Sequence, residues 1–229
     1  MWQIWRGRHF RDSTILRHLG SGDIADTPVD GLQALKGWLQ AVHYTPKGPA
    51  WTLIYRGSRD GWRASDFHAA CDGKGPTVVM VLGVGANDGR NFVAGGYAAA
   101  SWTSPSSGLA VADPESARSV GRGSFLFSLV DAAGHAPVQL PRKPSSYGNA
   151  MFHAATGGPM FGGGELVVGG NSGLPLNAAA NSWTRTSRED CAYDATAAAA
   201  RGCTAFHGAG SLERWCFTVQ ELKVFALVL

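Results

Sequence analysis

Charged residues are few in this 229-residue sequence: Asp, Glu, Lys and Arg together make up 16% of it. The net charge is only +3, and no run of Lys and Arg indicates the basic patch of a nucleic-acid-binding protein. Long apolar runs are lacking too, because no window approaches the roughly 18 uninterrupted apolar residues that a transmembrane helix needs. The sequence therefore predicts no nucleic-acid partner and no insertion into a membrane.

A secretory leader is also missing from the sequence. Residues 1–6 (MWQIWR) contain none of the apolar stretch that defines a signal peptide. We therefore expect a cytoplasmic protein, free or attached to a large assembly or to an organelle surface. An organellar presequence that has already been removed is the alternative.

Cysteine is scarce, and its spacing indicates no metal site. The four residues are Cys71, Cys191, Cys203 and Cys216, and no two of them form a C-x-x-C pair. His68 and Cys71 could place two ligands on one helical face, but two ligands do not complete a zinc site. We expect reduced structural thiols, and neither a metal nor another cofactor.

Sequence signals for catalysis are absent as well. There is no G-x-S-x-G nucleophile elbow. Residues 83–89 (GVGANDG) lack the glycine spacing of a dinucleotide-binding loop, and another predicted strand, not a helix, follows them. Residues 73–77 (GKGPT) lack the P-loop spacing, and Pro76 has no amide to offer a phosphate. The sequence predicts that the protein is not an enzyme.

Glycine and apolar residues are abundant. The chain contains 31 glycines, and hydrophobic residues make up 45% of it, enough for a packed core joined by many turns. The apolar residues of 30–42 recur every three or four positions, which predicts a one-sided helix capped by Asp30. Two shorter helices are expected at residues 12–16 and 65–70, the second capped by Ser65.

β-Strands are predicted along the rest of the chain. Apolar, β-branched or alternating segments mark them at residues 51–55, 77–82, 91–97, 124–129, 150–153, 165–168, 214–219 and 221–227. Most of the connecting segments are too short for a crossover helix, so neighbouring strands should pair antiparallel. We therefore predict an α+β fold: a mainly antiparallel two-sheet β-sandwich with peripheral helices, concentrated near the N-terminus. Residues 174–210 have the weakest pattern.

Two neighbouring segments carry a resemblance to a known family. Residues 53–62 (LIYRGSRDGW) and 67–77 (FHAACDGKGPT) resemble the signature of the TLD, or TLDc, domain. Four later blocks follow in the family's order: FVAGGY with Trp102, then SFLFSL, GPMFGGG and FTVQELKVF. Because these six blocks extend over most of the chain, we expect an N-terminal arm at 1–11 and a single TLDc domain at 12–229.

The resemblance implies a β-sandwich and a non-catalytic module that binds other proteins. Members of the family protect cells against oxidative damage, and several bind the vacuolar proton pump (V-ATPase) and regulate its assembly. The N-terminal part looks like the versions found in unicellular eukaryotes. Residues 178–210, rich in Ala and Gly, depart from the family's pattern and put the identity of the partner in question. The alternative function is that of a structural accessory subunit in a large cytoskeletal or ciliary assembly.

Four charged residues of the signature segments are the candidate binding residues: Arg59, Asp60, Asp72 and Lys74. We favour a structural role, in which the two carboxylates cap turns through the backbone and Arg59 or Lys74 pairs with them. The alternative is a polar contact patch or an acid–base pair.

Cys71 is the candidate for redox chemistry, because the nearby Lys74 could lower the pKa of its thiol. The alternative, which we favour, is a small buried residue at a helix end. Trp2 and Trp5 precede the predicted domain and are candidate anchors for a partner. Gly75 is expected to occupy a turn that requires glycine-only backbone geometry.

Overall fold

The computed structural model describes residues 29–43, 50–86, 88–111, 113, 123–131, 133–143, 150–170, 172–184, 192–194 and 215–228. The predicted arm with Trp2 and Trp5, the helix expected at 12–16 and most of residues 178–210 lie outside these ranges. Within the described part, no helix is long and apolar enough to cross a membrane.

The described part contains a long N-terminal helix, two short helices and eleven strands. The helices are α2 (Val29–Val42), α3 (Gly57–Asp60) and α4 (Ala64–Cys71). The strands are β1 (Ala50–Arg56), β2 (Thr77–Gly85), β3 (Asn91–Ala98), β4 (Leu109–Val111), β5 (Phe125–Val130), β6 (Val138–Pro141), β7 (Met151–His153), β8 (Met160–Phe161), β9 (Leu166–Val167), β10 (Ser182–Thr184) and β11 (Trp215–Val228).

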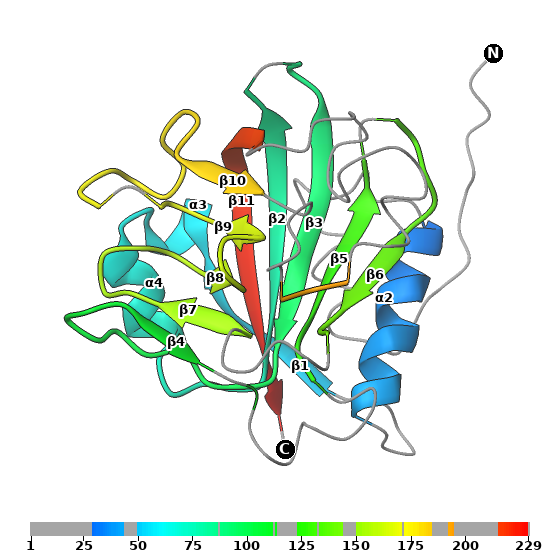
Figure 1. Ribbon diagram of the computed structural model, residues 1–229, viewed down its shortest axis with the longest axis horizontal. Coiled ribbons are helices and arrows are strands. Elements are labelled where there is room, and N and C mark those ends of the chain that lie inside the picture. The colour runs from blue at the N-terminus through cyan, green and yellow to red at the C-terminus, as the bar shows by residue number, and fades with distance from the viewer. Residues whose placement is uncertain are drawn as a thin grey trace.

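The strands form two layers that share one hydrogen-bonded path. Its order is β4-β7-β8-β9-β10-β11-β2-β3-β5-β6, β1 pairs with β11, and all these pairs are antiparallel. β11 pairs with β10 near its start, with β2 along its middle and with β1 at its end, so it connects the layers. β2, β3, β5 and β6 lie in the larger layer, while β4 and β7–β10 form the smaller one (Figure 1). The α+β fold, a mainly antiparallel β-sandwich with peripheral helices, is confirmed.

The larger layer has an apolar core on each of its faces. Val78 and Val79 are neighbours in β2, so their side chains point to opposite faces. Val78 belongs to a buried cluster with Leu35 of α2. Val79 belongs to a second cluster with Phe67 of α4 and Phe161 of β8. Because both faces are covered, β2 is a continuous apolar run in the sequence instead of an alternating one.

A β-bulge in β11 controls where one acidic side chain points. Val219 and Glu221 pair with consecutive residues of β2, so Gln220 is the extra residue of the bulge. Val219 before the bulge and Leu222 after it lie in the same apolar cluster. Regular alternation from Val219 would direct Glu221 into that cluster. The bulge therefore keeps the Glu221 carboxylate out of the apolar core and turns it towards α3.

Both predicted helix caps are wrong. Helix α4 begins at Ala64, and the backbone N–H of Arg63 donates to the Asp66 carboxylate at 2.9 Å, so Ser65 is not the N-cap. Helix α2 begins at Val29, which puts Asp30 in its first turn. An acidic side chain there still favours the helix, because it faces the positive end of the helix dipole.

The strands also differ from the prediction. β4, β6, β8 and β10 lie in segments where no strand was predicted, and β10 lies in the segment with the weakest pattern. β2 continues to Gly85, which shortens the predicted turn that follows it. Strands of two or three residues carry too little periodicity to be recognised, and they form because neighbouring strands pair with them.

Candidate functional site

The buried side chain of Tyr55, at the end of β1, joins the first signature loop (residues 56–63) to α4, which leads into the second signature loop (residues 71–76). The Tyr55 hydroxyl donates to the carbonyl oxygen of Gly61 at 2.7 Å, which closes the first loop. The Tyr55 ring packs edge-on against Phe67 of α4, with the ring centroids 5.8 Å apart. Burial raises the pKa of the Tyr55 phenol, so the hydroxyl remains a neutral donor.

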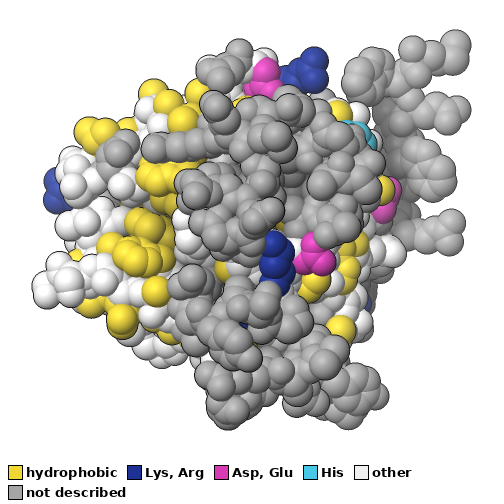
Figure 2. Space-filling model, viewed as in Figure 1, with side chains coloured by type: hydrophobic (Ala, Val, Ile, Leu, Met, Phe, Trp, Pro, Cys, Tyr) yellow, Lys and Arg dark blue, Asp and Glu magenta, His cyan; other side chains and the backbone are white. Residues whose placement is uncertain are grey.

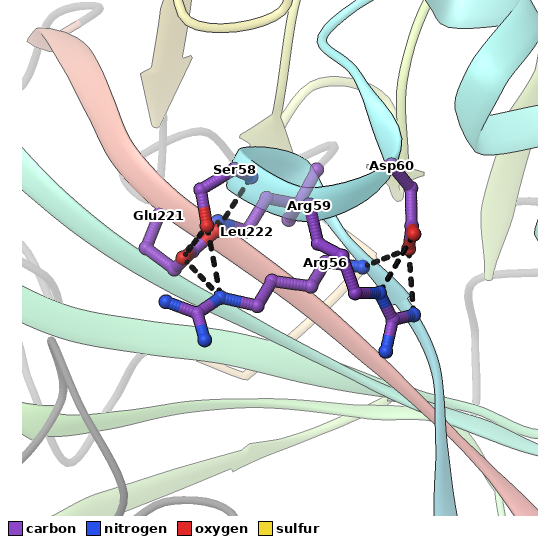
Figure 3. A network of polar contacts seen from close by, with 6 residues as sticks. All are labelled: Arg56, Ser58, Arg59, Asp60, Glu221 and Leu222. Atoms are coloured by element: carbon purple, nitrogen blue, oxygen red, sulfur yellow. Dashed lines mark hydrogen bonds and ion pairs between the residues drawn. The ribbon is translucent and has the colours of Figure 1, made fainter.

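The carboxylate of Glu221 holds the first signature loop against β11 (Figure 3). One oxygen accepts from Arg56 Nε at 2.7 Å and from the Ser58 hydroxyl at 2.6 Å. The other accepts from the backbone N–H of Ser58 at 3.2 Å and from that of Leu222 at 3.1 Å. Glu221 is 1% exposed, so this network replaces the water that a buried carboxylate loses.

Arg59 and Asp60 form an ion pair with two hydrogen bonds on the surface of the same loop. Arg59 donates from Nε and Nη2 to the two Asp60 oxygens, both at 2.7 Å. Asp60 also accepts from the backbone N–H of Arg56 at 2.8 Å. The hydrogen bonds from Arg59 lower the pKa of Asp60. The expected pairing of Arg59 with Asp60 is present, and both side chains still reach solvent, with Arg59 52% exposed.

Asp72 pairs with His68, a partner that the sequence did not predict. His68 Nδ1 lies 2.8 Å from Asp72 Oδ1, while Nε2 lies 3.0 and 3.1 Å from the carbonyl oxygens of Ala154 and Gly157. Both ring nitrogens thus lie within hydrogen-bond distance of oxygen atoms. Through these contacts His68 holds α4 against the loop that follows β7. Lys74 is exposed, and no ion pair joins it to Asp72 in the described structure.

Glu221 and His68 are the residues that sequence reasoning missed as parts of the site. Glu221 lies 163 residues from Ser58 in the chain, and His68 lies 86 residues from Ala154. The available signal for Glu221 was an acidic residue inside a mainly apolar closing strand. A charge at such a position needs a partner, but the sequence does not say which one.

The TLDc domain family model matches residues 32–201. The chain belongs to the TLDc domain family. The matched region contains both signature loops and every strand from β1 to β10, while β11, which supplies Glu221, follows it. No curated protein matches the sequence.

The environment of Cys71 in this TLDc domain disfavours a reactive thiol and fits the favoured interpretation of a small buried residue. Cys71 is completely buried at the end of α4. Burial raises the pKa of its thiol, and the carboxylates of Asp72 and Asp60 raise it further. The expected influence of Lys74 does not prevail, because desolvation and two negative charges disfavour the thiolate more strongly. The thiol is therefore protonated and shielded, which matches the alternative of a small buried residue.

His153 is a second buried histidine of the TLDc domain, next to the signature loops. Its Nδ1 lies 2.8 Å from the Thr103 hydroxyl, and its ring packs on Trp102 with the centroids 5.3 Å apart. No described group hydrogen-bonds to its Nε2. Burial lowers the pKa of His153, with a further contribution from His68 and an opposing one from Asp72. His153 is thus neutral at neutral pH.

The second signature loop depends on close packing at Gly75. A Cβ atom at this position would lie 2.7 Å from the backbone N and Cα of Ser101. The positive φ of the loop belongs to Gly73 instead, at 71°. The expected requirement for glycine therefore has a different cause, namely the approach of a neighbouring backbone.

Proposed function

We propose that this TLDc domain is a non-catalytic protein-binding module with the roles typical of its family, resistance to oxidative stress and regulation of the V-ATPase. The observation that carries this proposal is the arrangement of the signature loops. Charged side chains of these loops, such as Arg59, reach solvent. Cys71, the candidate for redox chemistry, is completely buried.

Hydrogen bonds hold each signature loop to the rest of the domain. The Glu221 network holds the first loop, and the pair of His68 and Asp72 together with the backbone bond from Gly73 N–H to Trp102 O at 3.0 Å holds the second. Charged groups fixed in this way lose little conformational freedom when a partner binds. Arg59 and Lys74, both exposed, are the contact residues that we propose.

The absence of catalysis is part of the proposal. The carboxylates of the signature loops already pair with neighbouring side chains or backbone groups. The protonated, buried Cys71 is a poor nucleophile. Among the described residues, no three His, Cys, Asp or Glu side chains gather in a group that could hold a metal ion.

Affinity purification with the full chain as bait, from the cells that make it, tests the proposal. We expect V-ATPase subunits to be enriched over an untagged control when the purified proteins are quantified by mass spectrometry. The double variant Arg59→Glu/Lys74→Glu should lose this enrichment. The double variant Lys36→Glu/Arg90→Glu makes the same change in charge on α2 and in the β2–β3 turn and should keep it.

Three results would overturn parts of the proposal. A purification without any pump subunit would remove the regulatory role. Enrichment of cytoskeletal or ciliary proteins in their place would support the accessory-subunit alternative. Equal enrichment with both double variants would show that the signature loops are not the contact surface.

A further inference from the structure

His153, the last residue of β7, contacts the segment to which the second signature loop is attached. Its Nδ1 lies 2.8 Å from the Thr103 hydroxyl, and its ring packs on that of Trp102. The carbonyl oxygen of Trp102 accepts a hydrogen bond from the backbone N–H of Gly73 at 3.0 Å, and Trp102 also pairs with Asp72 as an isolated β-bridge. The imidazole of His153 therefore lies directly against the residue that holds the loop.

A second contact links the residue after His153 to α4, which leads into the same loop. The carbonyl oxygen of Ala154 accepts from His68 Nε2 at 3.0 Å, because a carbonyl oxygen has no proton to donate. His68 Nδ1 in turn lies 2.8 Å from Asp72 Oδ1. Two consecutive residues, His153 and Ala154, thus contact residues 102–103 and α4, and the second signature loop is bonded to both.

The surroundings of His153 suit a neutral ring better than a cationic one. The side chain is 2% exposed, and no described group hydrogen-bonds to its Nε2. The titratable groups that act on it are His68, which opposes a positive charge, and Asp72, which favours one. The strands paired with β7, which are β4 and β8, and residues 101–105 contain no ionisable side chain. Figure 2 shows apolar side chains gathered over β7–β10, with uncharged ones around them.

Protonation of this ring favours a form of the domain in which the contacts of His153 are open. A protonated imidazole donates from both nitrogens, and in the closed form the Nε2–H has no acceptor among the described groups. A buried charge without a partner is costly, so the charged ring is more stable where water reaches it. In such an open form the pKa of His153 has its ordinary value of 6.5, whereas burial lowers the pKa in the closed form. The open form therefore takes up the proton first as the pH falls, and the equilibrium shifts towards it.

We propose that His153 makes the attachment of the second signature loop sensitive to pH, so that the loop separates from residues 101–103 under mildly acidic conditions. The consequence rests on the proposed function, because Lys74 of this loop is one of the two proposed contact residues. The module then binds its partner at neutral pH and releases it as the pH falls. The first signature loop does not respond in this way, because the network around Glu221 contains no histidine, the side chain that titrates in this range.

Hydrogen–deuterium exchange of the purified full chain, followed by mass spectrometry, tests this proposal. Peptides from the two signature loops are compared at about pH 7.5 and about pH 5.5, after correction for the intrinsic exchange rate of free amides. We expect the protection factor of residues 71–76 to fall by up to about tenfold, because protonation with a pKa of 6.5 favours the open form by that factor at about pH 5.5. The protection factor of residues 56–63 should stay the same.

Three histidine variants assign the pH response to one ring. His153→Gln cannot gain a charge, so protection of the second signature loop should no longer depend on pH. His68→Gln keeps a donor for the Ala154 carbonyl and should retain the response. His135→Gln, in the β5–β6 turn, is the matched control and should retain it too. Circular dichroism checks that each variant is folded, and NMR titration of the His153 ring in the wild type gives a second measurement, which should coincide with the opening of the loop.

Four results would overturn the proposal. They are unchanged protection of the second signature loop at both pH values, equal losses in both loops, a response that survives in His153→Gln, and a response that disappears in His68→Gln. Any of them would leave the binding role of the signature loops standing, because the exchange is measured without a partner. A purification without pump subunits would in turn leave the pH response untouched.

Discussion

The signature loops and the smaller layer of the sandwich differ in how they use charge. In the loops, charged side chains are brought close to an apolar core, and each buried carboxylate is matched to donors, as Glu221 is matched to Arg56 and Ser58. The strands β4 and β7–β10 of the smaller layer contain no Asp, Glu, Lys or Arg, and glycines such as Gly108 make room for apolar side chains. The loops therefore depend on specific polar pairs, whereas the smaller layer depends on apolar packing.

This difference predicts how each region responds to substitution. Removing one member of a buried polar pair leaves its partners unsatisfied, so the cost is large and local. Substitutions of buried polar residues in the signature loops should therefore lower the stability of the TLDc domain more than substitutions of their exposed charges.

The largest effect is expected from Glu221→Leu. It leaves the Ser58 N–H and the Arg56 guanidinium without their buried acceptor, and the free energy of unfolding should fall by about 3–5 kcal/mol. Urea denaturation measures this change. The matched variant Gln220→Leu alters the exposed residue of the bulge and should change stability little. Equal stability of the Glu221→Leu and Gln220→Leu proteins would contradict the assigned role of the network.

Gly75→Ala should have the next largest effect. Its methyl group would lie 2.7 Å from the Ser101 backbone, so the second signature loop and the segment that follows β3 must separate, at a cost of about 1–3 kcal/mol. Gly37→Ala is the control, because nothing lies within 4 Å of its Cβ position in α2. There the substitution should stabilise the helix by up to about 1 kcal/mol. If thermal unfolding showed both variants shifted in the same direction, the packing argument would be wrong.

A pH dependence is expected from His153. Its pKa in the folded protein lies below the ordinary value of 6.5, so the unfolded chain takes up the proton first. The stability that the neutral ring contributes is complete above pH 6.5 and is lost as the pH falls below it. The difference in unfolding free energy between the wild-type and His153→Gln proteins, followed from neutral to mildly acidic pH, should shrink. A difference that stayed constant would contradict the neutral buried state.

The smallest effect is expected from Arg59→Ala. Arg59 and Asp60 form an exposed pair, and such pairs contribute at most about 1 kcal/mol. Urea denaturation should therefore show nearly unchanged stability, even though the binding of the partner weakens. A loss as large as that of Glu221→Leu would mean that the surface pair, and not the buried network, holds the loop.

The parts of the fold that were predicted are those with a strong local pattern. The three- and four-residue spacing in α2 and the apolar run of β2 define these elements without help from the rest of the chain. β8 and β10 have two and three residues, and their pairing partners determine them. A segment of that length has no period to detect.

The site was predictable only as far as its contacts are local. Arg59 and Asp60 are adjacent in the sequence, and their pairing was expected and is present. Asp72 pairs with His68 of α4. Glu221 accepts a hydrogen bond from Ser58, which lies 163 residues earlier in the sequence. Burial of Cys71 was the favoured interpretation, and Asp72, which also raises the pKa of its thiol, is the next residue in the sequence. Only the smaller contribution of Asp60 to that pKa comes from a loop that the fold brings near.

Survival of peroxide-treated cells that lack this protein, rescued by variants expressed at equal abundance, tests the central claim most directly. If the domain acts by binding through its signature loops, Cys71→Ala should protect as well as the wild type, and Arg59→Glu/Lys74→Glu should not protect. Loss of protection with Cys71→Ala, together with full protection by the double variant, would contradict the account and assign the function to the buried thiol.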